Sequence, residues 1–228
     1  MQTVEIILEE LKSMSNDAFK EKLKHFGIEN EQALGIRIPE LRALAKTIGK
    51  NTDLAQELWK INIHEAKLLA AFIVNPKELT EADIDQWVQD FNSWDICDQT
   101  CNAISATPLA EKLIFKYVAS EEEFVRRTAF VLMCTQAVHN RELPDNEFYK
   151  YFALIEQYAW DNRNFVRKAV NWALRQIGKR NLHLHEKSIE TAERIKLQDS
   201  GSAKWIAADA LRELNDPKII RRMTNKKM

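Results

Sequence analysis

Two carboxylates, a tryptophan and two cysteines lie close together in the segment NSWDICDQTCN, residues 92–102. These residue types could bind a metal, supply a thiol nucleophile or present a reactive carboxylate. Residues four apart share one face of a helix, so Trp94 and Asp98 would lie side by side if the segment is helical. Asn92 or Ser93 could cap the start of that helix. The segment therefore offers an indole and a carboxylate next to each other on a surface outside the core.

The alternatives to a reactive carboxylate have less support. A metal site would need further ligands near Asp95 and Asp98, and neither His139 nor the cysteines stand at a supporting spacing. A thiol nucleophile at Cys97 or Cys101 would need a histidine partner, and the sequence identifies none. Small cysteines are more often buried packing residues. The sequence thus predicts no metal and no cofactor, and it leaves open a structural role for Asp98 in capping or ion pairing.

The composition indicates an all-helical protein without membrane segments. The 228 residues include only five glycines and five prolines, with 45% hydrophobic and 29% charged residues. No run approaches the roughly 18–20 apolar residues that cross a bilayer, and the start, MQTVEIILEELKSM, is too acidic and amphipathic for a signal peptide. Three cysteines without metal-type spacing favour a reduced, cytoplasmic compartment.

Prolines recur at a regular interval along the chain. The five prolines are Pro39, Pro76, Pro108, Pro144 and Pro217. They stand 37, 32, 36 and 73 residues apart, and the last interval is about twice the others. Proline is tolerated at helix starts and in turns but not inside helices. A proline about every 35 residues in a helical chain therefore marks a repeating unit of two helices, which is the signature of an α-solenoid.

Similar segments repeat at nearly the same period. FVRRTAFVLM begins at residue 124 and FVRKAVNWAL at 165, and shifting VRKAVNWALRQI by 37 residues aligns it with AKWIAADALREL, residues 203–214. HEAKLLAAFIV, residues 64–74, is a more degenerate copy. Apolar residues recur at helical spacing in each copy. The unequal lengths favour HEAT-like repeats, which would form one curved domain over residues 1–228 with a concave groove. An irregular helical bundle stays the alternative.

Basic residues gather in the last third of the chain. Residues 1–160 carry 17 lysines and arginines against 26 acids, whereas residues 161–228 carry 16 against eight. Basic residues also recur at matching places in the copies, at Arg126, Arg127, Arg167, Lys168 and Lys204. Stacked repeats would place them in a row that suits a phosphate backbone. The simpler alternatives are a solvated helix face and a basic tail at about 217–228.

Four motifs follow one another along the chain: GIRIPELRALAK at 35–46, SWDICDQ at 93–99, FVRRTAF at 124–130 and FVRKAVNWALR at 165–175. Together, on a chain with this repeat period, they resemble the DNA alkylation repair family of HEAT-like-repeat DNA glycosylases. The second motif is similar to the family's Trp-Asp-x-x-Asp active-site helix. The third and fourth are similar to the helices that supply an arginine and a second tryptophan, which fall here on Arg127 and Trp172.

The resemblance implies a monofunctional DNA repair hydrolase. Its substrate would be a purine alkylated at N3 or N7 in duplex DNA, which is cationic and already a good leaving group. Asp98 would stabilise the positive charge that moves onto the deoxyribose. Trp94 and Trp172 would flank that sugar, and Arg127 would hold the adjacent phosphate. The resemblance implies no metal, and the lesion would stay largely stacked in the duplex.

Two other functions remain open. Relatives in the superfamily bind branched or distorted DNA without excising bases, and many helical repeats bind proteins. For the glycosylase and for the non-catalytic DNA binder, the expected partner is double-stranded DNA that is alkylated or distorted. In all three cases we expect a cytoplasmic monomer that does not associate with membranes.

Overall fold

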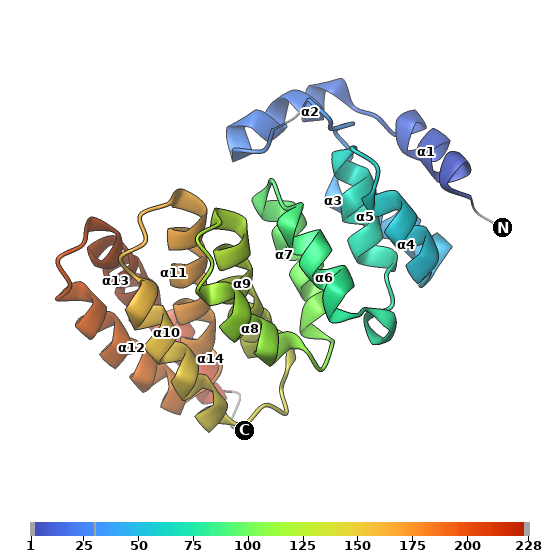
Figure 1. Ribbon diagram of the computed structural model, residues 1–228. Coiled ribbons are helices and arrows are strands. Elements are labelled where there is room, and N and C mark those ends of the chain that lie inside the picture. The colour runs from blue at the N-terminus through green and yellow to red at the C-terminus, as the bar shows by residue number, and fades with distance from the viewer. Residues whose placement is uncertain (1–2, 30, 226–228) are drawn as a thin grey trace. The chain divides into compact units, whose positions relative to one another are not determined.

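The computed structural model describes residues 3–29 and 31–225, which are all-helical as the composition predicts and contain no strand (Figure 1). The chain divides into two compact units, residues 1–110 and 111–228. Each unit has its own packed helices. The single domain expected over residues 1–228 stays a prediction.

The first unit is built around a buried central helix, α5. Its helices are α1 (Val4–Ser13), α2 (Asp17–Leu23), α3 (Ile38–Ile48), α4 (Thr52–Trp59), α5 (His64–Ile73), α6 (Glu81–Gln89) and α7 (Trp94–Ser105), with 3-10 turns η1 (Lys24–Phe26) and η2 (Pro76–Glu78). Side chains of Asn or Thr accept first-turn N–H groups at the starts of α1, α2, α4 and α6. The apolar α5 is buried nearly all round and packs against α3, α4 and α7.

A buried glutamate ties the segment before α3 to α5. The Glu65 carboxylate accepts hydrogen bonds at 2.8, 2.7 and 3.1 Å from three consecutive backbone N–H groups, those of Leu34, Gly35 and Ile36. Gly35 has φ +78°, and a Cβ there would lie 2.2 Å from the carbonyl oxygen of Asn16. Only glycine allows this backbone conformation together with so close an approach.

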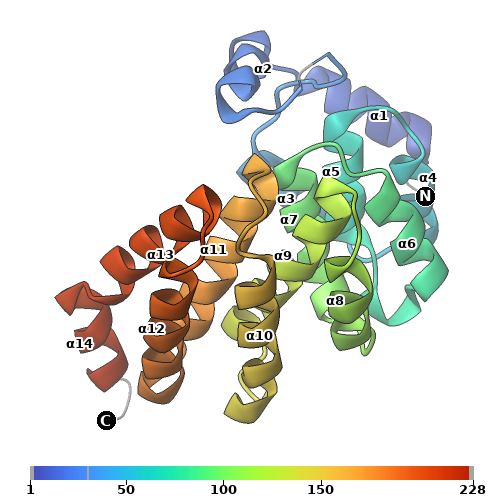
Figure 2. The same ribbon diagram turned by 60° about the vertical axis from the view of Figure 1, so that its left-hand side comes forward.

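The second unit stacks the repeated segments. Its helices are α8 (Ala110–Val118), which begins at the boundary, α9 (Glu123–His139), α10 (Tyr149–Tyr158), α11 (Asn164–Gly178), α12 (Leu182–Lys196), α13 (Gly201–Leu214) and α14 (Pro217–Asn225), with the 3-10 turn η3 (Asp145–Phe148). The copies that begin at residues 124, 165 and 203 fall on α9, α11 and α13. Helix α11 packs against both of the others, and Figure 2 shows the three in one layer beside α10 and α12. The predicted repetition is confirmed here.

Proline and apolar spacing set the helix boundaries as expected. Pro39 lies in the first turn of α3, Pro76 begins η2, Pro144 precedes η3 and Pro217 begins α14.

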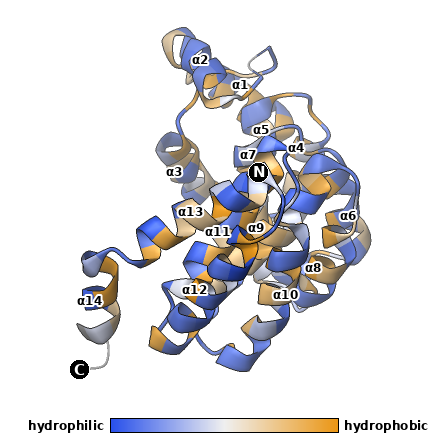
Figure 3. Ribbon diagram, turned by 90° about the vertical axis from the view of Figure 1, so that its left-hand side faces the viewer, coloured by the Kyte–Doolittle hydropathy of each residue, from blue (hydrophilic) through white to orange (hydrophobic). Residues whose placement is uncertain are grey.

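Helix α9 is buried along most of its length, whereas α10 and α12 bury one face. Helices α10 and α12 therefore carry both apolar and polar residues, as amphipathic helices do (Figure 3).

None of the described helices is long and apolar enough to cross a membrane. The described residues also hold no group of three or more histidine, cysteine or acidic side chains placed to bind a metal ion. Cys97, Cys101 and Cys134 are buried thiols. Residues 217–225 of the predicted basic tail form α14, and residues 226–228 lie outside the described residues.

Candidate nucleic-acid interface

Helix α7 carries the first pair of predicted site residues. It begins at Trp94, and Asp98 follows one turn later; both side chains are half-buried. The Trp94 indole packs against a small apolar cluster of Leu23, Ile28 and Ala33. Its Nε1 donates a hydrogen bond to the carbonyl oxygen of Phe26 at 2.9 Å. The predicted helix is confirmed, and part of the Trp94 ring supports the N-terminal segment.

The neighbouring acid, Asp95, is buried in an ion pair. Its Oδ2 lies 2.8 Å from Nε2 of His64 on α5, and only 7% of the residue is exposed. Burial alone would raise the pKa of Asp95, but the hydrogen bond and charge of His64 lower it overall. Burial likewise disfavours the imidazolium, yet the hydrogen bond and charge of Asp95 raise the pKa of His64. Asp95 therefore belongs to the core, whereas Asp98 is half-exposed.

Arg42 on α3 adds a cation beside this part of α7. It is exposed, and its Nη2 donates to Oε1 of Gln99, the residue after Asp98, at 2.9 Å. Its guanidinium also lies 5.2 Å from the centre of the Phe72 ring. The sequence prediction gave Arg42 no role, although its place in the motif GIRIPELRALAK was the available signal.

Arg126 on α9 lies inside the second unit. Its Nη1 donates to Asp161 Oδ2 at 2.6 Å and its Nε to the carbonyl oxygen of Val118 at 3.1 Å. The guanidinium also faces the rings of Tyr158 and Trp160, at 4.9 and 5.8 Å from their centres. With 7% of the residue exposed, these contacts hold it in the core. The phosphate contact predicted for Arg126 stays a prediction, and its buried partner Asp161 lies 35 residues further along the chain.

Arg127, next on α9, is also buried. Its Nη1 donates to the carbonyl oxygen of Phe165 at 2.7 Å, which links α9 to the start of α11. The rings of Phe124 and Phe165 stack beside this link, with centres 5.2 Å apart. The arginine that the family motif places here thus bridges two successive repeats. Its predicted phosphate contact stays a prediction.

The remaining predicted residues lie at the surface of α11 and α13. Lys168 is exposed and Trp172 is half-exposed; four residues apart on α11, they share one face. The Trp172 Nε1 lies 2.9 Å from the side-chain amide of Gln176, placed to donate to its oxygen. Lys204 is exposed on α13, with its Nζ 3.6 Å from Asp199 Oδ1. Lys168 and Lys204 are therefore accessible cations, as a phosphate contact requires.

Polar side chains link α11 to α13 in successive turns. Asn171 Nδ2 donates to Asp209 Oδ2 at 2.6 Å. One turn on, Arg175 pairs with Glu213 and lies 3.7 Å from Asp209. Lys179 Nζ then donates to Glu213 Oε1 at 2.5 Å. The acids of α13 thus neutralise the cations along the middle and C-terminal end of α11.

The sequence matches a family model described as DNA alkylation repair enzyme over residues 7–217. The chain belongs to this family. A search of curated proteins with this sequence finds no match.

Among solved structures, one similar fold is described as belonging to a family of proteins related to the HEAT-like repeat DNA glycosylases with affinity for branched DNA structures. It has a TM-score of 0.78 and 19% sequence identity and covers 93% of this chain and 95% of that chain. This likeness confirms the HEAT-like fold predicted for the DNA alkylation repair family member. A designed armadillo repeat protein has a TM-score of 0.37 and 15% identity over 86% of this chain and 100% of its own.

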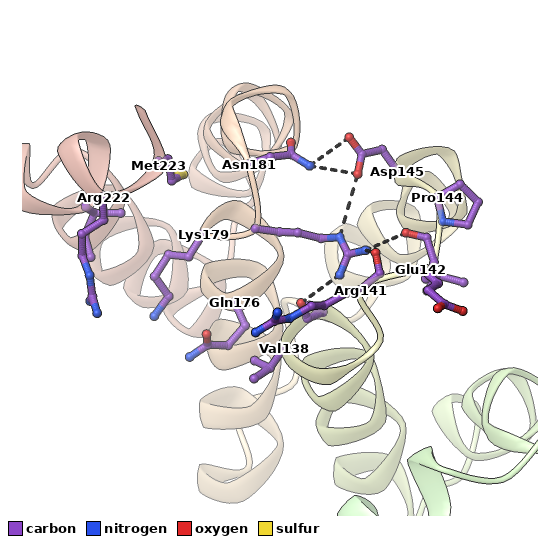
Figure 4. A pocket seen from close by; sticks show the side chains of 14 residues that line it. Val138, Arg141, Glu142, Pro144, Asp145, Gln176, Lys179, Asn181, Arg222 and Met223 are labelled. Atoms are coloured by element: carbon purple, nitrogen blue, oxygen red, sulfur yellow. Dashed lines mark hydrogen bonds and ion pairs between the residues drawn. The ribbon is translucent and has the colours of Figure 1, made fainter. Parts of the chain in front are cut away.

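A cavity of about 870 Å³ lies in the second unit of this DNA alkylation repair family member, at the C-terminal ends of α9 and α11 (Figure 4). Arg141 and Arg222 are among its lining residues. Arg180, also on its wall, is held by backbone carbonyl oxygens, including that of Leu143 at 2.7 Å. Arg167 lies at the other end of α11, whereas Gln176, which lies 2.9 Å from the Trp172 indole nitrogen, is on the cavity wall.

Proposed function

We propose that this chain binds duplex DNA and hydrolyses the N-glycosidic bond of purines alkylated at N3 or N7. Membership of the DNA alkylation repair family supports the substrate class. Asp98 is assigned as the reactive carboxylate because the two acids on α7 lie in different environments. Asp95 is bound to His64 in the core, whereas Asp98 is half-exposed one turn after Trp94.

The chemistry needs one carboxylate near the sugar and one water molecule. An alkylated purine is cationic, and it leaves with the electron pair of the glycosidic bond, which makes the base neutral. Positive charge then develops on the deoxyribose, where the Asp98 carboxylate would stabilise it. Water adds its oxygen to the sugar carbon and loses a proton to Asp98 or to solvent. The face of Trp94, one turn before Asp98 on α7, would add a weaker attraction to the same charge.

Exposed cations would hold the DNA backbone. In the first unit Arg42 lies beside α7, and in the second unit Lys168 and Lys204 are exposed on α11 and α13. Lysine and arginine side chains at such positions bind phosphates through charge and hydrogen bonds, without reading the base sequence. Arg126 is left out of this proposal because it is buried in a pair with Asp161.

Release of free base tests the proposal. The purified protein should liberate 7-methylguanine from a duplex that contains it, as measured by chromatography of the released base. Asp98→Asn should lower the rate at least about 100-fold while binding of the duplex is kept. Glu57→Gln, which removes an exposed acid of α4, is the matched control and should leave the rate unchanged. Absence of release by a folded protein that binds the duplex would overturn the glycosylase proposal.

A second candidate is a DNA-binding protein without glycosylase activity, selective for branched or distorted DNA. Two observations favour it. The solved structure with a TM-score of 0.78 is of a protein described as having affinity for branched DNA structures. The Trp94 indole is also partly engaged by Phe26 and its neighbours. Tighter binding of a four-way junction than of a duplex, weakening steeply with salt, would support this candidate. No binding of any DNA at low salt would leave a protein-binding repeat.

A further inference from the structure

Trp205 on α13 is a partly exposed aromatic residue in contact with an arginine. Of its surface, 37% is exposed, and the guanidinium carbon of Arg167 on α11 lies 4.5 Å from the centre of its ring. Cation–aromatic contacts of this kind hold both groups in one orientation. The contact therefore fixes a flat, partly exposed ring beside a positive charge near the N-terminal ends of α11 and α13.

The Arg167 charge has no carboxylate partner in the part of the chain that the structure describes. In the following turns of the same interface, Arg175 and Lys179 are neutralised by Asp209 and Glu213. Arg167 is a repeat position without such an acid, so its guanidinium keeps a charge that no described side chain neutralises. An incoming anion such as a DNA phosphate would complete this end of the interface.

Exposed lysines adjoin both residues of this pair in the sequence. Lys168 follows Arg167, and Lys204 precedes Trp205. Asp199 lies 3.6 Å from Lys204, but both groups are largely exposed, so this pair is weak. The N-termini of α11 and α13 add partial positive charge at the same end. The nearby acid Asp161 is already bound by Arg126 and Arg163.

We infer that Trp205 and Arg167 form a stacking site for an unpaired DNA base, with Lys168 and Lys204 on the flanking phosphates. This inference rests on the proposed function in requiring that the chain binds DNA. An aromatic face binds any base by stacking, and a positive groove holds the backbone beside it. Paired bases inside a regular duplex cannot reach a side chain on a protein surface, whereas bulged bases and bases at a branch can. The site therefore selects distorted over regular DNA.

A fluorescent base reports this contact. 2-Aminopurine is placed as a single bulged base in one duplex and as a paired base in a second duplex of the same flanking sequence. The folded wild-type protein should quench the bulged probe, because stacking on an indole quenches its emission, and should leave the paired probe nearly unchanged. Trp205→Ala should abolish the quenching and weaken binding of the bulged duplex about tenfold, with little effect on the regular duplex.

Phe115→Ala is the matched control. Phe115 is 44% exposed in the same unit and also lies near a cation, Lys150, at 5.9 Å from its ring centre. Lys150 is neutralised by Glu111 and Glu147, so this pair offers an aromatic surface without a spare charge. The control should bind and quench like the wild type. Arg167→Gln serves as a second variant that keeps the ring, and it should weaken binding of the bulged duplex several-fold.

The outcomes separate this inference from the proposed function. Unchanged quenching and affinity in both Trp205→Ala and Arg167→Gln, with DNA binding intact, would overturn the stacking site alone. A loss shared equally by Phe115→Ala would overturn it as well. If the folded wild-type protein binds neither duplex at low salt, the stacking site and the proposed function both fall.

Discussion

The Asp95 carboxylate and the His64 imidazole are in contact inside the first unit, 2.8 Å apart, although 31 residues separate them in the sequence. The contact joins α7 to α5, the central helix of that unit. It also places Asp95 in the core, so the two acids of the segment SWDICDQ lie in different environments. The two acids stand three positions apart, yet Asp95 is buried and Asp98 is half-exposed.

The stability of the first unit should depend on pH through this pair. The pKa of His64 is raised above its ordinary 6.5, so its contribution is complete below pH 6.5 and is lost as the pH rises through the higher folded value. The pKa of Asp95 is lowered below 3.8, so its contribution is lost only in stronger acid. Urea unfolding measured at a series of pH values should show the greatest stability between pH 3.8 and pH 6.5, the ordinary pKa values of aspartate and histidine.

Removing one partner isolates the contribution of the pair. Asp95→Asn should lower the free energy of unfolding by about 3 kcal/mol near pH 6, because a buried His64 loses its counter-charge. The fall in stability above pH 6.5 should also become shallower. Wild-type and variant curves that run parallel from pH 5 to 8 would contradict the ion pair.

The three N–H groups bound by Glu65 predict a second stability effect. Glu65→Gln removes the charge and one acceptor, so the bonds to Leu34, Gly35 and Ile36 cannot all be kept. We expect a loss of about 2 kcal/mol in chemical denaturation. The exposed Glu57→Gln is the control with the same change of atoms, and it should lie within about 0.5 kcal/mol of the wild type.

Two glycines of similar φ provide a matched comparison. Gly35 and Gly49 have φ +78° and +77°, but only at Gly35 would a Cβ meet other atoms, with the carbonyl oxygen of Asn16 at 2.2 Å. Gly49→Ala should cost about 1–3 kcal/mol from backbone strain alone. Gly35→Ala should cost clearly more in thermal unfolding, because α2 must move as well. Equal costs would show that the segment around Asn16 yields freely.

Arg126 and Lys168 should separate stability from DNA binding. Burial alone would raise the pKa of Asp161, but hydrogen bonds from Arg163 and Arg126 lower it overall. Arg126→Gln should therefore destabilise the second unit by about 3 kcal/mol and leave the affinity of the folded fraction unchanged. Lys168→Gln should leave the stability unchanged and weaken DNA binding. It should also reduce the slope of log affinity against log salt concentration by about 1. Salt titrations of both variants, with unfolding curves, distinguish the two roles.

Sequence periodicity predicted the helices well, because the position of apolar residues and prolines is itself what determines them. The copies at residues 124, 165 and 203 are α9, α11 and α13. The same reasoning could not predict the environment of single charges. Arg126 and Arg167 occupy the same position in their copies, yet only Arg126 meets a buried acid, Asp161, from the next repeat.

Trp205 shows what an exact alignment of copies can still miss. The shift of 37 residues that relates residues 166–177 to 203–214 aligns Trp205 with Lys168. A search for a row of cations passes over that position because the residue is aromatic. The contact between Trp205 and Arg167 crosses from one repeat to the next, so it becomes evident only when α11 and α13 are seen side by side.

The hydrogen bond from Trp94 to Phe26 couples access to an aromatic face with local opening of the chain. Residues 17–28 rest on a cluster of only a few apolar side chains, and segments with so little buried surface open at a lower free energy than the central helices. Each opening would release the indole at the start of α7. A ligand that takes the ring must therefore compete with this segment, and by reciprocal linkage its binding would speed amide hydrogen exchange in α2.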